Sequence, residues 1–372
     1  SLPTVGNGNL SLKKDDAIKT HLKCDNEFYN KISAKMLRSY ISLDLYVTNG
    51  GFIDMITVTK PAEITSGVVK YYPNIIANED EYLLGKDMVD EIAKIEGYQA
   101  LLKVRPSSGL SVESYYLDSV EYGDRDPMIP VVTKDTTIDV LLKYDNKLKV
   151  GTDVHFQTAL LYTDIHGVRK VRSINCDGGV SNNIIDVFKL INQDVVMRII
   201  IKDIIRTLDV CDFVNIRKVI DEKIVDVLTQ YRALVSGTSS TQLILPDALK
   251  TLPLYLLSFE KSNLMKPNNQ SARGNDRCFD LLKYGMFSPS KLNFKLYPQI
   301  IPFHILLEQE DLSFYDANET MLQVKPTTIP NISVRNSHTS LENGGCYFIF
   351  NGEAVYLWFN ENTNRMLLYD LL

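Results

Sequence analysis

The segment YQALLKVRPSSGLSVESYYL, residues 98–117, decides the fold class of this 372-residue chain. It holds two runs rich in aliphatic and aromatic residues, separated by the turn residues PSSG, which is typical of β-strands joined by a turn. The runs TIDVLLKY, FQTALLYT and VRKVRSI repeat this texture, and DIHG between the last two is predicted to form a hairpin turn. We therefore predict an antiparallel β-sandwich over residues 97–179.

Residues 1–96, before this segment, are predicted to form an α/β domain. YISLDLYV and GVVKYYP have the composition of short strands, and a helix is expected after each. In the second helix Leu84, Met88 and Ile92 recur every four residues, which is the spacing of an apolar helical face. Gly97 is expected to end this helix, because glycine favours the position that follows the last turn.

Residues 180–293 are predicted to be helical. An apolar stripe at helical spacing runs over residues 216–231, and Gly237 is expected to close that helix. In LILPDALKTLPLYLLSFEKS, Pro246 and Pro253 suit the beginnings of two helical segments, because the first turn of a helix does not need the missing N–H. The sequence therefore predicts an all-helical domain for residues 180–293.

Residues 294–372 return to mixed structure and are predicted to form an α/β module. Before them, KPNNQSARGNDR at 266–277 is predicted to be a flexible surface loop. In GCYFIFNGEAVYLWF, Asn351 and Gly352 can both adopt positive φ, which predicts a two-residue type I′ turn between the strands CYFIF and EAVYLWF. The whole chain is thus multidomain α+β.

The composition excludes several classes of function. The net charge is −6, which gives no support to nucleic-acid binding, and no apolar run approaches the roughly 18 residues of a membrane-spanning helix. No phosphate-binding glycine motif and no HExxH pair of zinc ligands occurs. The five cysteines are far apart, so we expect no disulfide framework, no zinc site, no cofactor and a reducing, cytosolic setting. The N-terminus does not resemble a secretion signal.

Two positive charges in the segment 98–110 form the one candidate binding site. Residues i and i+2 of a strand share a face and lie about 6.5–7 Å apart, so Lys103 and Arg105 point the same way. Gln99 and Leu101 are expected on this face, and the opposite face is expected to carry the four residues Tyr98, Ala100, Leu102 and Val104.

Two interpretations of this basic face stay open from the spacing alone. Exposed cations on a sheet aid solubility and protect edges from unwanted pairing. Alternatively, the same spacing suits an extended acidic peptide, because carboxylates at its positions i and i+2 would match the two charges.

Several phrases, in their order along the chain, resemble one known family. They are SLPTVGNGNL, NEFYNKIS, VVKYYPN, YQALLKVRPSSGLSV, FQTALLYTDIHGVRKVRSI, VDVLTQYRALVS, LILPDALKTLPLYLLSFEKS, KLYPQIIPFHIL and GEAVYLWF. Together they resemble the cargo-adaptor subunit of the inner COPII vesicle coat, the Sec twenty-four family. The proline-punctuated LPDALKTLPLYLLS is the most distinctive of them.

The resemblance implies a domain order. Residues 1–96 would be the C-terminal part of an α/β, von Willebrand A-like trunk, and residues 97–179 the β-sandwich. Residues 180–293 would be the helical domain, and residues 294–372 an incomplete gelsolin-like module. The zinc-finger cysteines of the family do not occur here, and the start at Ser1 and the end in LLYDLL suggest a fragment.

The resemblance also implies a role for the basic face. In the family the strand matching LLKVR offers a basic pair to acidic cargo signals of the DxE type, and an apolar residue of the SGL segment lines the same pocket. The corresponding residues here are Lys103, Arg105 and Leu110, with Leu101 on the same face. Lys103 stands where the family usually has arginine, and an ammonium lacks the planar fork for bidentate binding of a carboxylate.

The partners implied are the sister inner-coat subunit (Sec twenty-three type), the coat-recruiting small GTPase, the cytosolic tails of membrane cargo and SNAREs, and, peripherally, the endoplasmic reticulum membrane. No catalysis is implied for the adaptor. Two alternatives stay open: the sister subunit, which activates the GTPase, and an unrelated enzyme that would hold a metal or a nucleotide.

Overall fold

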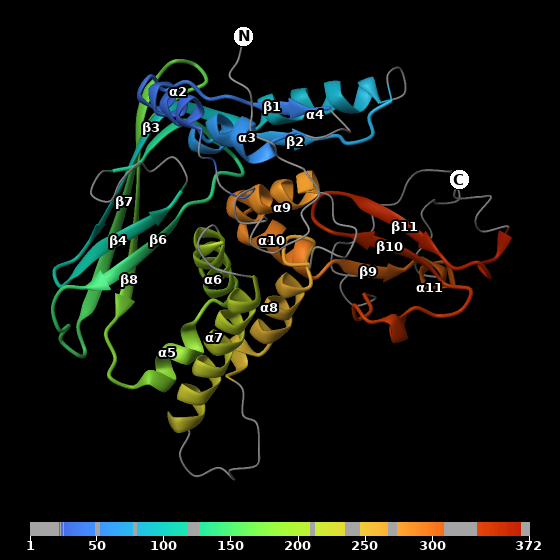
Figure 1. Ribbon diagram of the computed structural model, residues 1–372. Coiled ribbons are helices and arrows are strands. Elements are labelled where there is room, and N and C mark those ends of the chain that lie inside the picture. Colours follow the sequence, from blue (N-terminus) through green and yellow to red (C-terminus); the bar gives the residue numbers. More distant parts are fainter. Residues whose placement is uncertain are drawn as a thin grey trace, which may run out of the picture. The chain divides into compact units, whose positions relative to one another are not determined.

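The computed structural model describes residues 22, 24, 26–48, 53–76, 80–117, 126–208, 213–234, 246–266, 274–308 and 333–365. The chain divides into two compact units, Ser1–Ser288 and Pro289–Leu372 (Figure 1). The first unit holds an α/β part, a β-sandwich and a group of helices, and the second is a small mixed module.

The α/β part is built on two short parallel strands. Its elements are α2 (Glu27–Arg38), β1 (Leu45–Val47), α3 (Met55–Ile64), β2 (Val69–Tyr71) and α4 (Glu81–Ala93). Asn26 and Asp54 cap α2 and α3, because their side chains accept hydrogen bonds from backbone N–H groups of the first turns. Ala62 of α3 and Val69 of β2 pack with Leu282, which belongs to the helices of the same unit.

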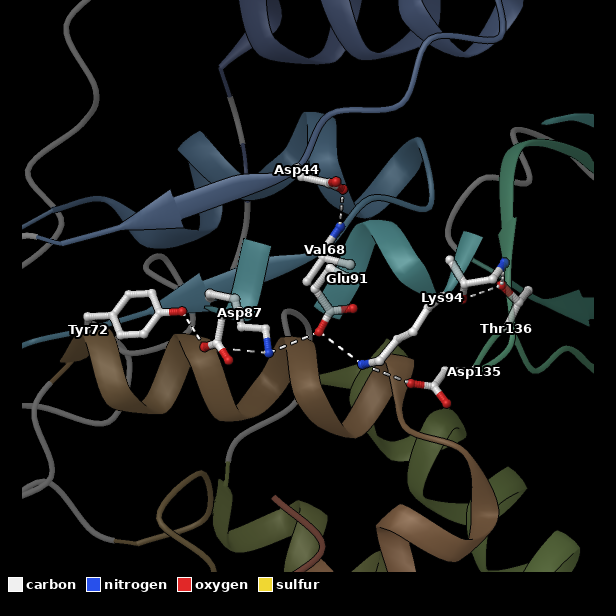
Figure 2. A network of polar contacts seen from close by, with 10 residues as sticks. Asp44, Val68, Tyr72, Asp87, Glu91, Lys94, Asp135 and Thr136 are labelled. Atoms are coloured by element: carbon white, nitrogen blue, oxygen red, sulfur yellow. Dashed lines mark hydrogen bonds and ion pairs between the residues drawn. The ribbon is translucent and has the colours of Figure 1, made fainter. Parts of the chain in front are cut away.

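The helix α4 buries the carboxylate of Glu91 and leaves two residues of its apolar stripe exposed. Met88 and Ile92 are 38% and 65% exposed, whereas Glu91 is buried. Glu91 forms ion pairs of 3.0 Å with Lys70 of β2 and with Lys94. Lys94 also reaches Asp135 at 3.3 Å, and Figure 2 shows Lys94 between Glu91 and Asp135. The helix that this spacing predicted therefore forms, but Met88 and Ile92 stay exposed, and the buried side of the helix is the one on which Glu91 meets Lys70 and Lys94.

Gly97 was wrongly expected to end α4. The helix ends at Ala93 with Lys94 as its cap, and Gly97 lies inside the next strand. A Cβ atom at Gly97 would lie 2.6 Å from the ring of Tyr162, so a close approach between strands accounts for this glycine.

The β-sandwich is confirmed as two antiparallel sheets. Its strands are β3 (Ile95–Pro106), β4 (Leu110–Tyr116), β5 (Met128–Thr133), β6 (Asp139–Tyr144), β7 (Asp153–Asp164) and β8 (Arg169–Gly179). One sheet has the order β5-β3-β7-β8, and β4 pairs with β6 in the other; β3, β7 and β8 run side by side in Figure 1. Ala100, Leu102 and Ile129 form the core between the sheets.

The strand β5 was missed in the sequence, and the phase of β3 was partly wrong. The pairing of β3 with β7 shifts between Tyr98 and Leu101, and Gln99 has a φ of 52°. This bulge turns Tyr98, which was expected on the face of Ala100, outward, so that it is 41% exposed. The predicted DIHG turn is confirmed, because Gly167 donates to the carbonyl of Asp164 and has a φ of 80°.

The helices after the sandwich follow the predicted pattern. They are α5 (Ile184–Leu190), α6 (Gln193–Thr207), α7 (Phe213–Leu234), the 3-10 turn η1 (Asp247–Leu249), α8 (Leu252–Glu260) and α9 (Gly274–Met286). Pro246 directly precedes η1 and Pro253 lies in the first turn of α8, as predicted. Gly237 lies outside the described residues. The predicted loop 266–277 is too long, since α9 already begins at Gly274 and buries Arg277.

A cluster of buried charges joins α6 to the sandwich. Arg198 Nε and Lys202 Nζ lie 2.6 Å and 2.8 Å from the same oxygen of Asp139, at the start of β6. At the end of β4 the hydroxyl of Tyr116 donates to Asp203 over 2.5 Å. The sandwich and the helices thus meet through a polar, largely dehydrated contact.

The second unit has a three-stranded sheet in the order β11-β10-β9. Its elements are α10 (Pro289–Leu296), β9 (Gln299–Pro302), α11 (Phe303–Glu308), the 3-10 turn η2 (His338–Ser340), β10 (Cys346–Phe350) and β11 (Val355–Phe359). The predicted hairpin forms, but the two-residue turn was wrong, because the last pair is Phe350 with Val355. The side chain of Asn351 accepts from the N–H groups of Glu353 and Ala354, which holds a longer loop in which only Gly352 has positive φ.

Candidate functional site

The outer face of the four-stranded sheet brings three of the four predicted site residues together. Ala100 and Leu102 point into the sandwich core, so the alternation of β3 places Leu101, Lys103 and Arg105 on the opposite, outer side. Both basic side chains are exposed and Leu101 is half-buried. We call this side of β3, β7 and β8 the outer face.

The strands beside β3 leave the two cations accessible. Lys103 lies opposite Ala159 of β7, and Arg105 lies opposite Gln157. On β8 the next residues in register are Ser173 and Asn175. These neighbours are small or neutral, so they neither cover nor neutralise the positive charges.

Among the residues that the structure describes, each cation has one weak partner that a ligand can replace. Lys103 Nζ lies 2.9 Å from a carboxylate oxygen of Asp126, and the two side chains are 48% and 41% exposed. Such exposed pairs contribute about 0.2–1 kcal/mol. Arg105 donates to the amide oxygen of Gln157 at 3.5 Å, and its other guanidinium N–H groups stay available for a carboxylate.

An apolar patch adjoins the basic pair on the outer face. Leu101 lies opposite Leu161 of β7 and Met128 of β5, and Leu161 lies opposite Val171 of β8, which is 68% exposed. Tyr98 continues the patch beyond the bulge. The outer face therefore offers positive charge and, next to it, a surface for an aliphatic or aromatic side chain.

The fourth predicted site residue, Leu110, belongs to the other sheet. It begins β4, pairs with Tyr144 of β6, and follows Gly109, whose φ is 96°. Among the described residues, the strand pairing, ion pair and hydrogen bond of these three side chains do not join Leu110 to Lys103 or Arg105. Its place in a pocket shared with them stays a prediction.

Sequence reasoning missed the residues of the outer face that lie outside β3. Leu161 and Val171 were within correctly predicted strands, but only the register of β7 with β8 puts them beside Leu101. Asp126 lies just before β5, the strand that was missed. Its ion pair with Lys103 could therefore not be predicted from the sequence.

Other kinds of site are not apparent in the parts of the chain that the structure describes. There, no group of three or more His, Cys, Asp or Glu side chains could hold a metal ion. The described helices are also all too short or too polar to cross a membrane.

Comparison with known proteins identifies the family. Models of the Sec23/Sec24 trunk, β-sandwich and helical domains match residues 1–92, 97–181 and 192–294, and a gelsolin repeat matches residues 327–372. The chain is 66% identical over all 372 residues to SED5-binding protein 3 of Saccharomyces cerevisiae and 29% identical over 381 residues to protein transport protein SEC24 B of Arabidopsis thaliana. The chain belongs to the Sec24 family of COPII-coat proteins.

The likeness to a solved Sec24 structure confirms the fold class. The human COPII-coat protein Sec24c superimposes with a TM-score of 0.84 at 22% identity, over 98% of this chain and 45% of that one. The chain spans 40% of SED5-binding protein 3 and 33% of SEC24 B. These relatives favour Sec24 over the sister subunit that the sequence alone left open. The exact domain limits assigned from the sequence remain predictions.

Proposed function

We propose that this chain is part of a Sec24-type coat subunit that binds sorting signals in the cytosolic tails of membrane cargo, for transport from the endoplasmic reticulum to the Golgi. It catalyses no reaction; it holds tails while the coat assembles. The observation that supports the outer face as a binding surface is the exposed pair Lys103 and Arg105 next to the apolar patch around Leu101.

The partners follow from the family. We propose that the chain works with the sister Sec23-type subunit and, through the coat complex, with the recruiting small GTPase, peripherally on the cytosolic side of the endoplasmic reticulum membrane and on coated vesicles. The name of SED5-binding protein 3 describes a protein that binds SED5, and we propose that this chain shares that capacity. The family resemblance also implies that the tails of SNAREs are among its cargo.

A single tail should bind weakly to the outer face. Two exposed ion pairs contribute about 0.2–1 kcal/mol each, and one buried aliphatic side chain about 1.5–3 kcal/mol. Together these contacts correspond to a Kd of roughly 0.2 mM or weaker. In a coat, many such sites act together on one membrane, and the raised effective concentration supplies selectivity while each tail can still leave.

A peptide titration tests this function. A peptide that carries an Asp-x-Glu signal should shift the NMR signals of Leu101 and of residues opposite it on β7. Changing both Lys103→Ala and Arg105→Ala should weaken binding at least fivefold, and Lys103→Arg should strengthen it about twofold, because a guanidinium can bind both carboxylate oxygens. Arg172→Ala is the matched control, since Arg172 is an exposed cation on the other side of the same sheet. Equal binding by the double variant would overturn the assignment of the outer face.

A further inference from the structure

Asp126 meets the basic pair of the outer face because of the register between β5 and β3. Leu101 of β3 pairs with Met128 of β5. Two residues further along β3, and two residues back from β5, Lys103 and Asp126 fall opposite each other on the same face. Pro127, between Asp126 and β5, still accepts a hydrogen bond from the backbone of β3 over 3.2 Å. The distance of 2.9 Å between Lys103 Nζ and the Asp126 carboxylate therefore follows from the pairing of the strands.

This carboxylate makes the two cations of the pair unequal. Lys103 has the charged partner Asp126, whereas Arg105 donates to the amide oxygen of Gln157 at 3.5 Å. An amide carries no charge, so this contact does not neutralise Arg105. A ligand carboxylate therefore adds a new ion pair when it binds Arg105, but it has to replace an existing one when it binds Lys103.

The Asp126 carboxylate has an advantage over a free ligand because it belongs to the same chain. A group tethered close to its partner competes at an effective concentration in the millimolar range. The pair can still open, because the side chains of Lys103 and Asp126 are 48% and 41% exposed. Exposed pairs of this kind change an equilibrium constant by a factor of only about 1.4 to 5. Asp126 should therefore weaken the binding of a ligand at Lys103 without preventing it.

We propose that Asp126 is a built-in competitor on the outer face and determines how much the second carboxylate of an acidic ligand contributes to binding. This rests on the function proposed above, in which the outer face binds acidic signals. When a ligand carboxylate takes Lys103, the Asp126 side chain turns to water, so one ion pair replaces another and little affinity is gained. The unmodified chain should therefore bind a signal with two carboxylates only slightly more tightly than a signal with one.

NMR titrations of the full chain with short capped peptides test this proposal. Asp126→Asn keeps the size of the side chain and removes its charge, so it should strengthen the binding of an Asp-x-Glu peptide about two- to fivefold. The peptides Asp-x-Gln and Asn-x-Glu each lack one carboxylate. In the unmodified chain the tighter-binding of these two should come within about twofold of Asp-x-Glu, and in Asp126→Asn the difference should grow to about fivefold. An unchanged difference would overturn the proposal.

Asp177→Asn is the matched control for the change of charge. Asp177 lies on the outer face in β8, its side chain is 72% exposed, and it pairs with His155 at 2.6 Å. Its loss changes the net charge as much as Asp126→Asn does, but it leaves the contact of Lys103 intact. It should therefore change the affinity for Asp-x-Glu by less than about 1.5-fold. An equal gain in both variants would mean a general effect of charge and would contradict the role of Asp126.

Lys103→Ala distinguishes a failure at Asp126 from a failure of the outer face. In this background Asp126→Asn should change binding by less than about 1.5-fold, because the contact that it breaks is already absent. If Lys103→Ala with Arg105→Ala weakens binding while Asp126→Asn alone has no effect, the outer face binds acidic signals and Asp126 does not compete. If the double variant binds as tightly as the unmodified chain, the outer face is wrongly assigned and the role of Asp126 is wrong with it.

Discussion

The helices α4 and α6 both turn charged side chains toward the rest of the first unit, but they do so at different depths. On α6, Arg198 is fully buried and Lys202 is 7% exposed, and their common partner Asp139 of β6 is 8% exposed. On α4, Glu91 is 8% exposed, but its partners Lys70 and Lys94 each keep 30% of their side-chain surface.

Because of this difference in burial, an ion pair at α6 and an ion pair at α4 contribute differently to the stability of the fold. Charges that are fully removed from water depend on one another, since an unpaired one is strongly destabilising. Charges that keep contact with water are screened, so the removal of a partner lowers the free energy of unfolding by less. We therefore expect the contact between the sandwich and α6 to be sensitive to substitution, and that around α4 to be tolerant.

Asp139→Ala should have the largest effect. It removes the common acceptor of Arg198 and Lys202 and leaves two buried cations, which should lower the free energy of unfolding by about 3–5 kcal/mol. Urea denaturation followed by circular dichroism measures it. Asp153→Ala, at an exposed carboxylate that begins β7, is the control and should change the value by less than about 0.5 kcal/mol. A loss as small as that of the control would show that the buried cluster does not hold the sandwich to α6.

Tyr116→Phe should have the next largest effect, and it depends on pH. The folded pKa of about 12 lies above the ordinary 10.0, because of burial and the hydrogen bond to Asp203. The hydroxyl therefore stabilises the fold fully below pH 10, and this contribution disappears as the pH rises from 10 to 12. Below pH 10 the variant should lose about 1.5–3 kcal/mol, and the gap to the unmodified chain should close in alkaline solution. A gap that stays constant up to pH 12 would contradict the role of the hydroxyl.

Glu91→Gln should cost less, about 1 kcal/mol, because Lys70 and Lys94 can turn to water when the charge is removed. Unfolding in low and in high salt measures it, and high salt should shrink the difference. A loss as large as that of Asp139→Ala would mean that depth of burial does not separate the two contacts.

Ile92→Gln should have the smallest effect, within about 0.5 kcal/mol, because the side chain is 65% exposed. The matched substitution Ile220→Gln, on the stripe of α7 where the side chain is fully buried, should destabilise the chain by several kcal/mol. Thermal unfolding of the two variants compares them. Similar losses would mean that α4 buries its apolar side after all.

The sequence alone predicted the buried side of a helix correctly where its apolar residues form one stripe that packs against neighbouring helices. The stripe of α7 buries Ile216 and Ile220 as predicted, and the prolines before η1 and in α8 stand where their chemistry requires. It failed on α4, where the pattern locates a helix but cannot tell which side meets Lys70, since that lysine lies on another element.

The candidate site was predictable to a similar extent. Alternation alone placed Leu101, Lys103 and Arg105 together, because these positions are neighbours on one strand. Leu161, Val171 and Asp126 depend on pairing between strands that lie far apart in the chain, which one sequence does not encode locally. Leu110 could not be placed because the turn after β3 sends the chain into the other sheet.

The bulge at Gln99 makes the two halves of β3 independent of each other. Before it Tyr98 points outward, and after it a new alternation begins, in which Ala100 points into the core and Lys103 points outward. A deletion of one residue at the bulge would turn Tyr98 into the core and leave both cations in place. We therefore expect changes in length on the side of α4 to be absorbed at the bulge before they reach the basic pair.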